Sequence, residues 1–76
     1  MQFTLAALEA APTKSVGQAD SLKIETGRTR VWLCRCGIAD GMPYDNQITV
    51  ERLVNGRWIT SDTFEGKPGI TFVIED

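Results

Sequence analysis

The stretch SLKIETGRTRVWLC, residues 21–34, decides the fold of this 76-residue chain. Apolar Leu22 and Ile24 alternate with charged Lys23 and Glu25, and a period of two is typical of a β-strand with one buried face. Thr26-Gly27 then offers a two-residue turn, because glycine accepts backbone torsions that other residues avoid. The stretch therefore predicts a β-hairpin.

The turn also predicts the register of this hairpin. With Thr26-Gly27 at its centre, the cross-strand pairs are Glu25 with Arg28, Ile24 with Thr29, Lys23 with Arg30, and Leu22 with Val31. One face then carries Leu22, Ile24, Thr29, Val31 and Leu33. The agreement between turn and apolar pattern favours the hairpin, since a slip of one residue would turn the whole apolar set toward solvent.

A second hairpin is predicted by ITVERLVNGRWIT, residues 48–60, because Asn-Gly is the strongest short-range signal for a hairpin turn. A two-residue turn at Asn55-Gly56 pairs Val54 with Arg57, Leu53 with Trp58, and Arg52 with Ile59. A type I turn with Gly56 as a bulge would shift this pairing by one residue. The sequence leaves both alternatives open.

The two ends of the chain complete the predicted fold. Residues 69–76, GITFVIED, read as a final strand with apolar or β-branched residues on both sides, which we expect to be covered on both faces. Residues 3–11, FTLAALEAA, suit either a helix capped by Thr4 or an opening strand, and Pro12 ends either element.

We predict one small domain, residues 1–76, that is mostly β: an antiparallel barrel or sandwich of five to six strands built from hairpins. If residues 3–11 are helical, the fold is instead α+β, with a short N-terminal helix on the sheet.

Composition narrows the class of protein. With 8 basic against 10 acidic residues the net charge is −2, the wrong sign for a general nucleic-acid binder. No apolar run approaches the ~20 residues that cross a bilayer, and the N-terminal stretch lacks the basic start of a secretion signal. We therefore predict a cytoplasmic chain without membrane contact or direct nucleic-acid binding.

Motifs for catalysis are missing from the sequence. It contains no histidine and no phosphate-binding glycine loop, and none of its serines lies in a G-x-S-x-G motif. We predict that the protein is not an enzyme, and that it has no catalytic residues and no cofactor.

Two cysteines stand in Cys34-Arg35-Cys36, where the first hairpin ends. A structural zinc site needs four ligands, and the chain supplies two cysteines and no histidine. The segment CRCGIADGMPYDN resembles the start of the CDGSH iron–sulfur motif, because Cys34, Cys36 and Pro43 fall at its spacing. Asp45 stands at the third cysteine position and the ligand histidine is missing, so the resemblance implies no cluster. We predict no metal, and thiols that pack as small apolar side chains.

A candidate binding surface remains. Arg28, Arg30 and Trp32 point away from the Val31/Leu33 face, and Trp and Arg are enriched at binding hot spots. The loop GIADGMPYDN, residues 37–46, exceeds the usual two to five residues of a hairpin loop and so suggests function. The predicted partner-binding residues are Arg28, Arg30, Trp32, Asp40, Met42, Tyr44 and Asp45. The competing interpretation buries Trp32 in the core and leaves the loop as a solvated turn.

These observations lead to three functional hypotheses. The first is a non-enzymatic protein-binding module; such a short chain suits a phage or mobile-element product, such as an anti-CRISPR-like inhibitor that covers a host protein complex in the host cytoplasm. The second is a self-associating structural subunit, such as a small virion component, whose first or last strand pairs between copies. The third is a small thiol or metal-binding protein that uses the Cys-Arg-Cys segment.

Overall fold

The computed structural model describes residues 1–16, 20–34, 38–39, 42–43 and 46–75. In chain order its elements are β1 (Gln2–Thr4), α1 (Leu5–Ala10), β2 (Ser15–Val16), β3 (Asp20–Glu25), β4 (Thr29–Cys34), β5 (Ile38–Ala39), β6 (Met42–Pro43), β7 (Asn46–Val54), β8 (Arg57–Gly66) and β9 (Thr71–Val73). Within the described part of the chain, no helix is long and apolar enough to cross a membrane.

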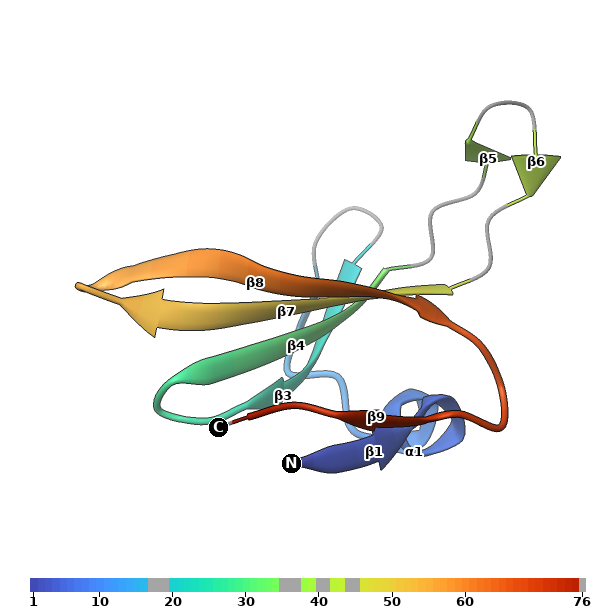
Figure 1. The fold of residues 1–76 in the computed structure, drawn as a ribbon, viewed down its shortest axis with the longest axis horizontal. Helices are drawn as coiled ribbons and strands as arrows, with labels where there is room; N and C mark the ends of the chain where they lie inside the picture. The colour runs from blue at the N-terminus through green and yellow to red at the C-terminus, as the bar shows by residue number, and fades with distance from the viewer. Residues whose placement is uncertain (17–19, 35–37, 40–41, 44–45, 76) are drawn as a thin grey trace.

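The strands form an open, two-layered β structure (Figure 1). Five of them make one antiparallel sheet in the order β2-β3-β4-β7-β8, and β1 pairs with β9 in a two-stranded ribbon. Strands β5 and β6 pair with each other and stand away from the main sheet in the view of Figure 1. The predicted mostly-β, antiparallel class is confirmed, with two packed sheets; the main sheet does not close into a barrel.

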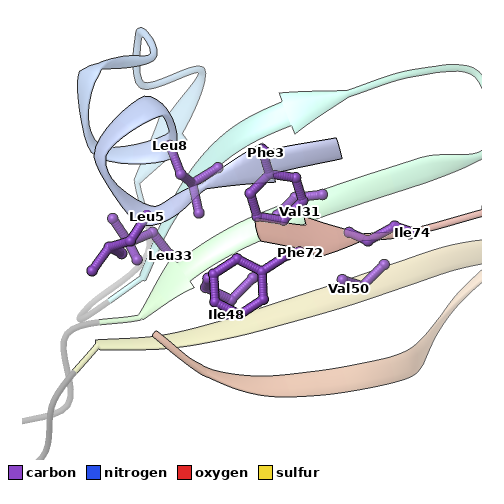
Figure 2. Close-up of a cluster of buried hydrophobic side chains, with 9 residues drawn as sticks. All are labelled: Phe3, Leu5, Leu8, Val31, Leu33, Ile48, Val50, Phe72 and Ile74. Atoms are coloured by element: carbon purple, nitrogen blue, oxygen red, sulfur yellow. The ribbon is translucent and has the colours of Figure 1, made fainter. Parts of the chain in front are cut away.

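The core lies between the five-stranded sheet and the β1–β9 ribbon with α1 (Figure 2). The sheet contributes Val31 and Leu33 from β4 and Ile48 and Val50 from β7. The opposing layer contributes Phe3, Leu5, Leu8, Phe72 and Ile74. The rings of Phe3 and Phe72 stack with their centroids 5.6 Å apart, which joins the first strand to the last inside the core.

Both N-terminal alternatives are realised, one after the other. Gln2–Thr4 is a strand that buries Phe3 against Phe72, and the helix begins directly after it. The Thr4 hydroxyl accepts a hydrogen bond from the Ala7 amide at 3.2 Å, so Thr4 caps the helix as predicted. The backbone is extended again at Ala11, before Pro12.

The second hairpin has the predicted two-residue turn. Val54 pairs with Arg57, Leu53 with Trp58 and Arg52 with Ile59, which settles the choice that the sequence left open. The φ angles are 51° at Asn55 and 78° at Gly56, and two consecutive positive values are the mark of a type I′ turn.

The register predicted for the first hairpin is wrong by two positions. Glu25 pairs with Arg30 and Ile24 with Val31, so the loop is Gly27-Arg28 rather than Thr26-Gly27. The Thr26 side chain explains the difference, because its hydroxyl accepts hydrogen bonds from the amides of Arg28 and Thr29 at 3.3 and 3.0 Å. The Thr26 amide also donates to the Thr29 carbonyl at 2.8 Å. A shift of two preserves the faces, so Ile24 still packs against the core.

Leu22 was predicted on the core face, and this is also wrong. The pairing of β3 with β4 shifts between Leu22 and Ile24, so that Leu22 lies opposite Trp32. The residue between them, Lys23, donates its ammonium to the Ala11 carbonyl at 3.1 Å and to the Thr13 hydroxyl at 3.0 Å. Leu22 is buried, yet it lies outside the core cluster.

The last strand is covered on one face, not on two as predicted. Phe72 and Ile74 are buried, whereas Val73 is 64% exposed. Because β9 belongs to the two-stranded ribbon, only one of its faces packs on the core, and its second face points to solvent.

The core-facing side of β4 contains a buried hydroxyl group, that of Thr29, whose effect on stability can be tested. Thr29 is fully buried, and among the described residues its hydroxyl has no hydrogen-bond partner. We expect Thr29→Val to raise the free energy of unfolding by about 1 kcal/mol, because valine keeps the shape and removes the unsatisfied group. Thermal unfolding followed by circular dichroism should show a Tm about 4–8 °C higher.

Thr26→Val is the matched control for this substitution. The Thr26 hydroxyl accepts two backbone hydrogen bonds, so its loss should lower the Tm. A Thr29→Val variant that melts below the wild type would contradict the assignment of an unsatisfied hydroxyl.

Candidate functional site

The face of the five-stranded sheet that points away from the core is the candidate site, and we call it the outer face. Residues that alternate with the core residues along each strand form it. They are Asp20, Leu22 and Glu25 from β3, Arg30, Trp32 and Cys34 from β4, Gln47, Thr49, Glu51 and Leu53 from β7, and Trp58, Thr60, Thr63 and Glu65 from β8. In Figure 1 the ribbon β1–β9 and α1 lie on the other side of the sheet. No described helix or strand covers the outer face.

Trp32 lies at the centre of the outer face. Its strand neighbours Val31 and Leu33 are buried in the core, whereas Trp32 is half-buried on the opposite side. This confirms the alternation predicted for the strand and contradicts the alternative in which Trp32 belongs to the core. The indole Nε1–H donates a hydrogen bond to Oε1 of Glu51 on the neighbouring strand, which fixes the plane of the ring.

Arg30 is held flat on the same face by two partners. Its guanidinium carbon lies 4.0 Å from the centroid of the Trp58 ring, a cation–π geometry. Its Nε donates to Oε2 of Glu25 at 2.6 Å. The sequence did not indicate that Trp58 stacks on Arg30, since the two residues belong to different hairpins.

A shallow hollow of about 350 Å³ opens beside Trp32. Its lining residues are Asp20, Trp32, Cys34, Thr49, Glu51 and Thr60. The Cys34 sulfur is buried and lies 3.7 Å from the Thr49 hydroxyl, so this thiol forms part of the floor. The hollow therefore combines an aromatic wall with hydroxyl and carboxylate acceptors.

The outer face carries polar and aromatic groups. Among the described residues, no three His, Cys, Asp or Glu side chains lie close enough together to hold a metal ion. The described residues of the hollow offer hydrogen-bond acceptors, a stacking surface and negative charge.

The structure places the predicted site residues in different parts of the molecule. Arg30 and Trp32 lie side by side on the outer face. Arg28 instead lies in the Gly27-Arg28 loop, exposed, with its carbonyl accepting from the Leu53 amide at 2.9 Å.

The remaining predicted residues belong to the loop at 37–46. Met42 lies in β6, where it pairs with Ala39 in the short ladder. Asp40, Tyr44 and Asp45 lie outside the described residues, as does Cys36. Their proposed role in binding stays a prediction.

Sequence reasoning missed several residues of the site, among them Asp20, Thr49, Glu51, Trp58 and Thr60. The missing information was the pairing of β4 with β7, which places Arg30 opposite Glu51 and merges two hairpins into one face. The opposite charges of this pair and the matching apolar faces were a signal that could have suggested it.

Comparison of the sequence and the structure with known proteins identified no relative of this chain. No protein family model matches this chain, and no curated protein and no solved structure shows significant similarity to it. The outer face is therefore interpreted from its own geometry.

The hydrogen bond between Trp32 and Glu51 generates a prediction. We expect Glu51→Ala to lower the free energy of unfolding by about 1 kcal/mol, because it leaves a half-buried indole N–H without its acceptor. Glu51→Gln keeps an oxygen at the same position and should stay close to the wild type. Urea titrations followed by circular dichroism measure both variants, and equal losses for the two would contradict the role of this hydrogen bond.

Proposed function

We propose that this chain is a non-enzymatic protein-binding module that acts in a cytoplasm and docks a protein partner on its outer face. The observation that carries the proposal is a pair of half-buried tryptophans, Trp32 and Trp58, with Arg30 stacked on one of them. Trp and Arg are the residue types that most often dominate the energy of protein interfaces. The proposal is further supported by a sheet face that no described element covers.

The side chains of this face are arranged before any partner binds. Glu25 and Trp58 hold the Arg30 guanidinium, and Glu51 holds the Trp32 indole. Long side chains that are already ordered lose less conformational entropy on association. A rigid aromatic surface with a polar border is what a docking site needs.

The proposal above does not specify which protein the outer face binds. Inhibition of a host protein complex by an anti-CRISPR-like phage protein stays a prediction, since it depends on what the outer face binds. The partner-capture experiment below addresses it directly.

Two adjacent residues of β8 provide a matched test of the proposal. Trp58 belongs to the outer face, whereas the neighbouring Ile59 points to the opposite side of the hairpin and is exposed. With the protein immobilised and a bacterial lysate as the source, we expect Trp58→Ala to reduce retention of a specific partner by about tenfold or more, the effect of losing a hot-spot aromatic.

Ile59→Ala should retain the partner like the wild type, because it removes apolar surface from the other side of the same strand. Circular dichroism establishes that both variants are folded. Equal retention by Trp58→Ala and the wild type, or no specific partner at all, would count against docking on the outer face.

Self-association is a second candidate function, and one observation favours it. The first and last strands, which were expected to pair between copies, pair with each other. The longest free edge is instead β8, which spans Arg57–Gly66 and has only β7 as a neighbour among the described strands. A long unpaired edge is a template for a strand from another copy.

Size-exclusion chromatography with light scattering separates the two candidates. Pairing through β8 predicts an apparent mass that rises to a multiple of the chain mass as concentration increases. The protein-binding module predicts the mass of a single chain over the same range, and a defined oligomer would favour the second candidate.

A further inference from the structure

The hollow on the outer face is acidic at both ends. Asp20 pairs with Cys34, and Glu51 pairs with Arg30, four residues away along β4 and one strand further across the sheet. Asp20 on β3 and Glu51 on β7 are thus two strand spacings apart. With about 3.3 Å per residue along a strand and about 4.8 Å between strands, these two positions lie about 16 Å apart. Among the described residues, six line the hollow, and they include both carboxylates and neither lysine nor arginine.

The basic side chains that the structure describes on β3 and β4 are engaged with other groups. Arg30 is paired with Glu25 and stacked on Trp58. Lys23 reaches toward the end of α1, where it donates to the Ala11 carbonyl and the Thr13 hydroxyl. Within the part of the chain that the structure describes, neither Asp20 nor Glu51 forms a close ion pair. Arg30 lies opposite Glu51 across the strands and offsets part of its charge, whereas Asp20 lies opposite Cys34.

The groups between the carboxylates suit a positively charged guest. Trp32 offers the face of an indole, which attracts ammonium and guanidinium ions. Thr49 and Thr60 add hydroxyl acceptors. Glu51 accepts the Trp32 N–H and, as an ionised carboxylate, has room for further donors.

The geometry points to a partner segment that presents two Lys or Arg side chains to this hollow, one at Asp20 and one at Glu51. This inference rests on the proposed protein-binding function and specifies the chemistry of the partner. In an extended segment, residues i and i+4 project on the same side about 13 Å apart, and their long side chains can splay to reach two carboxylates about 16 Å apart. A phosphate-bearing nucleic acid would instead be repelled by both ends.

A pair of short peptides tests this directly. The probes are acetylated and amidated Lys-Gly-Gly-Gly-Lys and the neutral control Gln-Gly-Gly-Gly-Gln, titrated into the full ¹⁵N-labelled chain. The readout is the NMR signal of the Trp32 indole N–H, with the Trp58 indole as internal reference. We expect the lysine peptide to shift the Trp32 signal in a saturable manner that weakens with salt, and the glutamine peptide to leave it unchanged.

Charge-removing variants complete the design. The double variant Asp20→Asn with Glu51→Gln keeps the shape of the hollow and the acceptor for Trp32, and should weaken lysine-peptide binding at least tenfold. Glu65→Gln removes a carboxylate from β8 outside the lining of the hollow, and should leave binding as in the wild type. A dispersed NMR spectrum of each variant establishes that it is folded.

The outcomes of these experiments distinguish a failure of the basic-segment inference from a failure of the proposed protein-binding function. Equal shifts with both peptides, no shift with either, or binding that the double variant does not weaken would overturn the basic-segment inference. A protein partner that depends on Trp58 would still support docking on the outer face in that case. Conversely, lysine-specific binding without any captured partner would keep the hollow as a cation site and remove the wider proposal.

Discussion

The pairing of the first strand with the last determines which face of the sheet becomes the core. The Met1 amino group donates to the Ile74 carbonyl at 2.8 Å, and Phe3 lies opposite Phe72 in the ladder. This ribbon, together with α1, supplies the apolar layer that covers Val31, Leu33, Ile48 and Val50. The other face of the sheet has no such layer among the described residues, and polar and aromatic side chains such as Arg30, Trp32 and Glu51 lie there instead.

The outer face replaces apolar packing with polar contacts between neighbouring strands. Glu25, Arg30 and Trp58 connect β3, β4 and β8, and Trp32 with Glu51 connects β4 and β7. Each contact orders an aromatic or basic side chain without burying it completely. The same contacts that keep these residues in place therefore leave their surfaces available to another molecule.

Local signals predicted part of this structure well. Asn55-Gly56 predicted the position of its hairpin turn, because the positive φ angles that the turn requires are a property of two adjacent residues. The choice between the two possible registers came from the structure. Thr4 likewise capped the helix from its own position. The alternation of Val31, Trp32 and Leu33 correctly separated the core from the candidate site.

The errors arose where a side chain or a distant strand overrides the local pattern. The Thr26 hydroxyl moved the first turn by one residue, and the irregularity at Lys23 turned Leu22 to the outer face. Pairing of residues 2–4 with 71–73 joins the two ends of the chain, and no short-range periodicity encodes it. The β4–β7 pairing, which assembles the candidate site from two hairpins, is non-local for the same reason.

A positively charged arginine and an acidic hollow lie on one face, and under the proposed function both would act on a charged partner. Arg30 and Trp58 make one region aromatic and basic, although Glu25 offsets part of the charge of Arg30. Asp20 and Glu51 make the adjoining hollow acidic. A basic segment placed over Arg30 would meet a like charge, whereas the same segment in the hollow meets two carboxylates. Under the proposed function, repulsion by Arg30 and attraction in the hollow would place a basic segment over the hollow, which is how charge contributes specificity to an interface more than it contributes affinity.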